Sequence, residues 1–201
     1  MKEDILEQLV DDYLQTRGYF TKHNIKFKPS KNHQDYSPLA DANHSDIDVI
    51  GFNPKKEGVE QVFVVSCKSW QSGFRVKAKL EEIEKVKIIS GREAWKAFRE
   101  LCQPKWSEAF CEVVYDVTGS RNFTYITAVT KLIGSRELWE NYGAFRDAIH
   151  GNPIKILTIE EMLNEITLDL TTTVASSDFG RTIQLLKTAD LLKESTKTGL
   201  H

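Results

Sequence analysis

The sequence predicts an α/β protein with a mixed β-sheet flanked by helices. Two observations lead to this prediction: β-branched and aromatic residues fill short segments in the N-terminal third, and helical and strand patterns alternate after them. The chain has 201 residues, enough for one well-buried domain with a small appendage. We expect a domain over residues 1–166, followed over residues 167–201 by a Thr/Ser-rich linker and a C-terminal helix.

Composition places the chain among intracellular globular proteins. Hydrophobic residues make up 40% and charged residues 28%, and the mean hydropathy is -0.39. No apolar run approaches the ~18 residues of a membrane span, and the acidic amphipathic start is unlike a signal peptide, so we expect a cytoplasmic protein without membrane contact. The 3 cysteines form no CxxC pair, which favours free thiols over a disulfide framework or a zinc site.

The first segment, residues 2–17, has the periodicity of an amphipathic helix that ends at Gly18. Its apolar residues recur at i, i+4 and i+8 and are Ile5, Leu6, Leu9, Val10, Tyr13 and Leu14. Glu7 lies at the border of this face, where its carboxylate can reach the edge of the core. We expect a strand over residues 20–27 and then a polar loop over residues 29–43.

Two further strands, residues 45–52 and 62–70, are predicted to form a hairpin across a turn rich in Asn, Pro, Lys and Gly. Asp48 in the first and Lys68 in the second cost desolvation energy in such apolar strands unless they are paired or bind something. Because residues two apart share a face of a strand, Ser66 and Lys68 should point together towards Asp48, with Cys67 pointing the opposite way.

The remaining chain is expected to alternate helices and strands. A long helical region should run to about Cys102, with a break at Ser90–Gly91. Most of its cations should form solubilising i,i+4 pairs, and the alternative is that some of them face phosphates. The later expected elements are strands over 112–116, 124–132 and 154–157, and helices over 136–149, 159–166 and 178–193. The last helix either packs on the domain or forms a dimer contact.

The spacing of Asp48 and Lys68 resembles that of the PD-(D/E)xK nuclease superfamily, especially its Mrr-like, restriction-endonuclease-like branch. In that family the Asp of one strand binds a divalent metal, and the next strand supplies an acid or Gln and a Lys two positions apart. Ser66 stands here at the position of the acid. The family motif Glu-x5-Tyr-Leu-x3-Gly-Tyr also falls in step, beginning at Glu7 and ending at Tyr19.

The resemblance implies a restriction-endonuclease-like fold and a Mg²⁺- or Mn²⁺-dependent endonuclease that hydrolyses phosphodiester bonds of DNA. Asp48 would be the principal metal ligand, ahead of its rival Asp46, with Glu7 and the backbone carbonyl of Cys67 as further oxygen ligands. Lys68 would orient the attacking water and stabilise the transition state, and Ser66 would hold a water. A nuclease-fold module that binds nucleic acid without cutting it is the alternative, and a purely structural Asp48–Lys68 ion pair is a third reading.

Local charge predicts the nucleic-acid contact. The net charge of -2 gives no global argument for nucleic-acid binding, but no acidic residue occurs from Tyr13 to Gln34. The lysines of this segment that we expect to contact phosphates are Lys22, Lys26, Lys28 and Lys31. A solvated basic loop is the alternative. Cutting both strands with one site per chain would favour a homodimer, and no small-molecule cofactor is implied.

Overall fold

A five-stranded sheet forms the middle layer of the computed structural model, which describes residues 4–169 and 177–191. Its strands, in the order β1-β2-β3-β7-β9, are β1 (Phe20–Phe27), β2 (Ser45–Phe52), β3 (Val62–Lys68), β7 (Thr124–Val129) and β9 (Ile154–Thr158). The first three strands are antiparallel neighbours, whereas β3, β7 and β9 run parallel. The predicted α/β class with a mixed sheet is confirmed.

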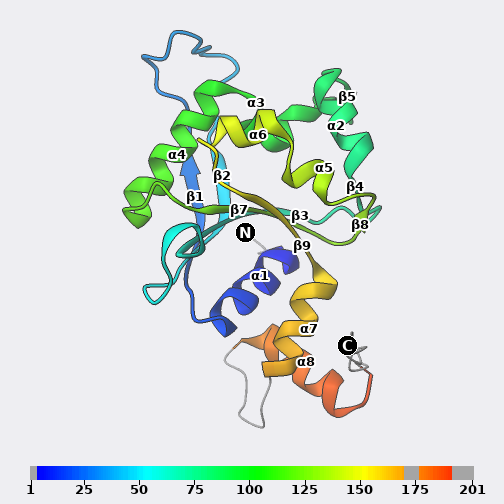
Figure 1. Cartoon of the computed structure of the whole chain (residues 1–201). Coiled ribbons are helices and arrows are strands. Elements are labelled where there is room, and N and C mark those ends of the chain that lie inside the picture. The colour runs from blue at the N-terminus through cyan, green and yellow to red at the C-terminus, as the bar shows by residue number, and fades with distance from the viewer. Residues whose placement is uncertain (1–3, 170–176, 192–201) are drawn as a thin grey trace.

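Helices cover both faces of this sheet (Figure 1). On one face lie α1 (Ile5–Thr16), α7 (Ile159–Asp169) and α8 (Asp178–Thr188), and their buried side chains belong to a cluster that we call the α1-side cluster. On the other face lie α2 (Val76–Glu84), α3 (Arg99–Cys102), α4 (Pro104–Thr118), α5 (Glu137–Glu140) and α6 (Gly143–Ala148). Their buried side chains belong to the α4-side cluster.

The N-terminal helix forms as the sequence predicts. Asp4 caps α1 by accepting a hydrogen bond of 2.9 Å from the amide of Leu6, and the expected apolar face is buried except for Ile5. The helix ends at Thr16, and Gly18 follows it with a φ of +80°, in the left-handed region that glycine adopts without strain. The predicted strand over residues 20–27 and the hairpin of β2 and β3 are also confirmed.

The expectation of a strand over residues 112–116 is wrong, because these residues lie inside α4. Local β-branched and aromatic residues favoured a strand, but the buried residues Trp106, Phe110 and Val114 repeat at i, i+4 and i+8, which is the period of a helix. Pro104 starts this helix and Gly119 ends it with φ +70°. Packing of this apolar face therefore overrides the local propensity.

The expected long helix before Cys102 is divided into shorter elements. After β4 (Phe74–Arg75) and α2, a hairpin of β5 (Ile88–Ile89) and β6 (Arg92–Glu93) turns at Ser90–Gly91, where the sequence predicts a break. Ser90 and Gly91 both have positive φ, as in a type I′ hairpin turn. The 3-10 helix η2 (Ala94–Phe98) then leads into α3, and two other short elements are η1 (Gly58–Glu60) and β8 (Leu132–Ile133).

The later elements partly match expectation. The helix expected over residues 136–149 is split into α5 and α6, whereas β9 and the helices α7 and α8 form close to their expected positions. The first residues of the expected linker continue α7 as far as Asp169, and residues 170–176 and 192–201 lie outside the described residues. α8 packs on the domain, because Ile183 is buried in the α1-side cluster and Ser177 donates a 2.7 Å hydrogen bond to Asp12.

No helix of the described chain is long and apolar enough to cross a membrane. This finding agrees with the absence of a long apolar run in the sequence.

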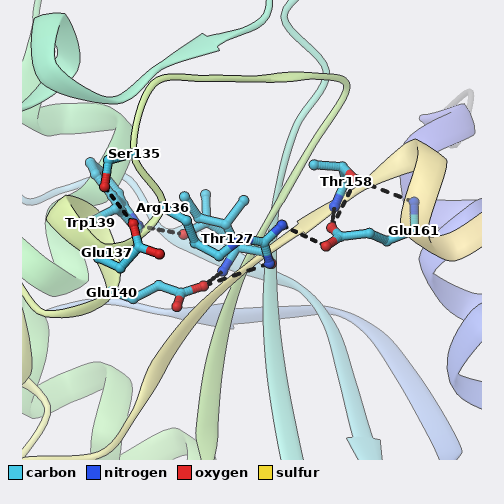
Figure 2. Close-up of polar contacts among 9 residues, drawn as sticks. Thr127, Ser135, Arg136, Glu137, Trp139, Glu140, Thr158 and Glu161 are labelled. Atoms are coloured by element: carbon cyan, nitrogen blue, oxygen red, sulfur yellow. Dashed lines mark hydrogen bonds and ion pairs between the residues drawn. The ribbon is translucent and has the colours of Figure 1, made fainter. Parts of the chain in front are cut away.

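Side chains next to and within α5 form hydrogen bonds with the backbone at the outer edge of β9 (Figure 2). Arg136 donates to the carbonyl of Ile156 at 2.8 Å, and the amide of Ile156 donates to Glu140 at 2.8 Å. Arg136 also donates to Glu161 of α7 at 2.5 Å, and Glu161 accepts from the amide and hydroxyl of Thr158 at 2.8 Å. An edge strand with free backbone groups would invite pairing with another chain, so this network closes one side of the sheet.

We expect Arg136→Met to lower the free energy of unfolding by about 1–3 kcal/mol, because charge-assisted hydrogen bonds to a strand edge are lost. Burial raises the pKa of Glu161, but hydrogen bonds from Thr158 and Arg136 outweigh it and leave that pKa below its ordinary value. The contribution of Glu161 is therefore present at neutral pH and disappears as the pH falls through the lowered pKa. Urea unfolding at neutral and acidic pH measures both effects. Lys155→Met, exposed on the same strand, is the control, and an equal loss in both variants would contradict the assignment.

Candidate functional site

Strands β2 and β3 separate at Asp48. The β2–β3 ladder ends at the pair Val49 and Val65, whereas β3 stays paired with β7 as far as Lys68. The backbone amide of Cys67 donates a hydrogen bond of 2.5 Å to Oδ2 of Asp48. Because a buried amide without an acceptor is costly, the carboxylate takes the place of the strand partner that β2 no longer supplies.

Strand β2 also changes its packing at Asp48. Ile47 packs in the α4-side cluster and Val49 in the α1-side cluster, although residues two apart on a strand normally share a face. The β1–β2 register skips Asn24 and Asp48 between the pairs His23–Val49 and Ile25–Ile47. The φ of Asn24 is +52°, a left-handed conformation that Asn tolerates better than most residues. Both strands are irregular at this point, so groups from both layers can approach Asp48.

The expected alternation along the end of β3 is confirmed. Cys67 packs against the α1-side cluster, while Nζ of Lys68 lies 5.1 Å from the ring centroid of Phe98 in the α4-side cluster. Ser66 is 8% exposed and lies on that same side, close enough to the phenol of Tyr125 to lower its pKa. Burial raises the pKa of the Cys67 thiol well above its ordinary value, so its backbone carbonyl rather than a thiolate is the group available to a cation.

Asp48 and Lys68 interact at a distance without forming an ion pair. The charge of Lys68 lowers the pKa of Asp48, but the ammonium group lies over Phe98 instead of touching the carboxylate. This arrangement does not support the reading of the two residues as a purely structural ion pair. Both charges remain available to a third group placed near them.

Glu7 approaches the same point from α1. This carboxylate is half-buried, and burial raises its pKa to about 7, with the negative charge of Asp48 as the next contribution. The start of α1 is fixed beside the end of β3, because Ser69 donates a hydrogen bond of 2.6 Å to Asp4. Ser69 directly follows Lys68, so the first turn of the helix and the end of the strand are held together.

The negative charges of Asp48 and Glu7 are only partly compensated by neighbouring groups. Burial raises the pKa of Asp48 to about 6, although Lys68 and the Cys67 amide both lower it. Asp46 is exposed, and its charge raises the pKa values of both Asp48 and Glu7, so it lies within electrostatic reach of the pair. Titrating groups pushed together in this way are typical of sites where a cation or proton has a role.

The donor set fits a hard divalent cation that keeps several waters. Within the described residues, no group of three or more His, Cys, Asp or Glu side chains is arranged to hold a metal ion. The oxygen donors that remain are the carboxylates of Asp48 and Glu7 with the carbonyl of Cys67. Mg²⁺ is commonly bound through one or two carboxylates with waters filling its other positions, and Mn²⁺ accepts the same oxygen ligands.

Sequence reasoning missed a buried acid beside this site. Glu100 of α3 is 6% exposed and accepts a hydrogen bond from the hydroxyl of the fully buried Tyr125. Ser66 lowers the pKa of the same phenol, and the charge of Glu100 raises the pKa of Asp48. The only signal in the sequence is an acid between two large apolar residues, Phe98 and Leu101.

The four lysines expected to contact nucleic acid are all exposed. Ile25 and Phe27 pack in the α4-side cluster, so alternation directs Lys26 and Lys28 towards the other side of β1. Lys26 faces Asp46 in the β1–β2 register, which brings the strand position of one expected contact close to the Asp48 region. Lys22 lies on the far side of the irregular Asn24, and Lys31 lies in the loop between the strands.

Comparison of this chain with protein-family models, with curated proteins and with solved structures found no match. The assignment of a function therefore depends on the residues and their geometry.

We predict that Asp48→Asn stabilises the fold above neutral pH by about 1–2 kcal/mol, because the Asn oxygen can still accept from Cys67 and no buried charge remains. The pKa values of Asp48 and Glu7 rise from 3.8 and 4.5 to about 6 and about 7. The folded state binds these protons more tightly than the unfolded state, so wild-type stability falls as the pH rises through this window. Thermal unfolding against pH should show a shallower fall for Asp48→Asn than for the control Asp116→Asn, at an exposed position of α4. Equal pH profiles for the two variants would contradict the prediction.

Proposed function

We propose that the chain is a metal-dependent endonuclease that hydrolyses phosphodiester bonds of DNA on a restriction-endonuclease-like fold of the PD-(D/E)xK superfamily. The observation that carries the proposal is the convergence of Asp48, Lys68 and Glu7 at the point where β2 and β3 separate. A helix followed by three antiparallel strands, with the acid on the second strand and the lysine on the third, supports the resemblance in its motif order.

Asp48, Glu7 and the carbonyl of Cys67 would hold the divalent cation. When bound, such a cation lowers the pKa of a coordinated water from ~15.7 towards ~7 and neutralises phosphate charge. Asp48 is fixed by its hydrogen bond from Cys67, and Glu7 is fixed by the attachment of Asp4 to Ser69. In this proposal two oxygen donors from different layers of the fold, one on α1 and one on β2, share the cation.

Lys68 would bind the scissile phosphate and orient the water that attacks it. Its ammonium lies over the ring of Phe98, a contact that restrains the side chain without neutralising its charge. A lysine that was already paired with Asp48 would have to break that pair before it could bind a phosphate oxygen. The position of the Lys68 ammonium over Phe98, without an ion pair to Asp48, therefore favours a role in transition-state stabilisation.

Glu100 would compensate for the missing acid at position 66 by fixing the direction of a hydrogen-bond chain. Tyr125 donates a hydrogen bond to Glu100, so its oxygen would be free to accept a hydrogen bond from the Ser66 hydroxyl. The oxygen of Ser66 would then offer only lone pairs and would accept a hydrogen bond from a water beside Asp48. Glu100 acts in this scheme as a positioning residue, and Ser66 performs the accepting role of the family acid.

A binding module without cleavage is the second candidate function. It is favoured by Ser66 in place of an acid and by the lack of three grouped metal-binding side chains among the described residues. Such a module would bind DNA through the same fold and leave it uncut. The two candidates differ in one measurement, which is hydrolysis in the presence of Mg²⁺ or Mn²⁺.

We expect wild-type protein to cut DNA with Mg²⁺ or Mn²⁺, and Asp48→Ala and Lys68→Ala to lower the rate by at least about a hundredfold. Duplex, single-stranded and RNA substrates should each be incubated with both metals and with EDTA, and products resolved by gel electrophoresis. Lys56→Ala, in the turn at the opposite end of the same two strands, is the control. Cleavage that survives Lys68→Ala would overturn the site, and wild-type protein that binds but never cuts would establish the binding module.

We predict that Glu100→Gln raises the metal concentration needed for half-maximal cleavage by roughly tenfold, because the amide no longer fixes the direction of the chain. In a Ser66→Glu background the same change should have little effect, since the new carboxylate supplies the accepting oxygen itself. The non-additivity of the two changes is the decisive quantity. If Glu100 has only a structural role, Glu100→Gln should lower the thermal stability equally in both backgrounds and leave the metal dependence of cleavage unchanged.

A further inference from the structure

A cleft of about 670 Å³ opens directly beyond the end of β3. Its walls come from the segment after Lys68, from α2, from the β5–β6 hairpin and from η2, and it begins with Trp70, two residues after Lys68. Neither Asp48 nor Lys68 lines it. The cleft is therefore a separate feature that adjoins the proposed active site through the chain.

The cleft is strongly cationic on a chain whose net charge is -2. The cations that line it are Arg75, Lys79, Arg92, Lys96 and Arg99, and the acids are Glu82 and Glu93. Lys79 and Lys96 are neutralised by ion pairs with these acids at 2.5 and 2.9 Å. The described residues contain no ion pair of the three arginines, so their charges are uncompensated.

Arginine at these positions favours phosphate as the ligand. The guanidinium group is planar, is always charged and can donate two parallel hydrogen bonds to phosphate oxygens. Arg75 and Arg92 are exposed, and Arg92 directly follows the Ser90–Gly91 turn, which holds it at the cleft wall. Arg99 is half-buried, with its guanidinium 4.8 Å from the ring of Trp106.

The aromatic floor of the cleft is already engaged. The ring of Trp70 stacks on Phe74 with centroids 5.8 Å apart, and Nζ of Lys79 lies 4.5 Å from the Trp70 centroid. A base that stacked on this ring would have to displace Lys79 from it. The groups that the cleft offers to a ligand are therefore charges, which contact the phosphates of any sequence.

We propose that this cleft binds the phosphates of one nucleic-acid strand that continues from the Asp48 site. Its volume is in the range of a small-ligand pocket, which admits a strand but not the width of a duplex. The inference rests on the proposed nucleic-acid substrate and not on cleavage. The sequence leaves open that some cations of this region face phosphates, and the inference assigns that role to Arg75 and Arg92.

The test is the salt dependence of binding to a fluorescein-labelled oligothymidylate, followed by anisotropy in EDTA so that no cleavage occurs. Arg75→Gln/Arg92→Gln should weaken binding on the order of tenfold and lower the slope of log K against log salt by about 1.4, or about 0.7 for each lost contact. Lys85→Gln/Lys87→Gln removes the same charge from exposed positions next to the cleft and should leave the slope unchanged. Matched thermal unfolding curves establish that both variants are folded.

The outcomes separate this inference from the proposed function. Equal losses of binding affinity in the two double variants would show a general charge effect and overturn the proposal that the cleft binds the strand. An effect of Arg75→Gln/Arg92→Gln confined to duplex DNA would overturn the single-strand assignment. If wild type never cuts but its binding depends on the two arginines, the cleft stands and the nuclease fails. If cleavage depends on Asp48 but binding does not depend on the two arginines, the proposed nuclease activity is retained and the proposed strand-binding role of the cleft is wrong. The variant expected to lower the slope is then Lys26→Ala/Lys28→Ala/Lys31→Ala.

Discussion

The hydrogen bond from the Cys67 amide to the Asp48 carboxylate determines where the sheet opens. It lets β2 leave β3 without abandoning a buried amide, and it fixes the acid at the point of separation. Beyond that point β3 continues beside β7 alone, so the side chain of Lys68 emerges where no β2 residue opposes it. Removing the acceptor would leave a buried donor unsatisfied, and the local geometry of both proposed catalytic groups depends on this one contact.

The position of Glu7 depends on how closely α1 approaches the sheet. A Cβ atom on Gly51 of β2 would lie 3.1 Å from Cδ1 of Leu14 in α1, so the helix packs where the strand has no side chain. At its other end the helix is held by the contact of Asp4 with Ser69. Two separate constraints thus set the height and the direction of the helix, and with them the position of Glu7, whose pKa the charge of Asp48 raises.

Sequence patterns predict the first half of the fold well, because its signals are local. Period-2 and period-3.6 patterns identify α1 and the first three strands, and residues two apart on β3 must share a face. Glu100 and Tyr125 could not be found in this way, since their contact joins two elements whose relative placement depends on packing. The same reason explains α4, where β-branched residues suggested a strand until burial of Trp106 and Phe110 decided for a helix.

The near-zero net charge of the chain conceals two regions of opposite sign that lie close along β3. Acids gather where β2 and β3 separate, and their raised pKa values show that the fold holds them together at a cost. Arginines gather in the cleft that follows Trp70. A cation bound by the acids and a phosphate chain bound by the arginines would each neutralise one region. A phosphodiester that bridged the two would therefore stabilise a charge distribution that the protein alone leaves unbalanced.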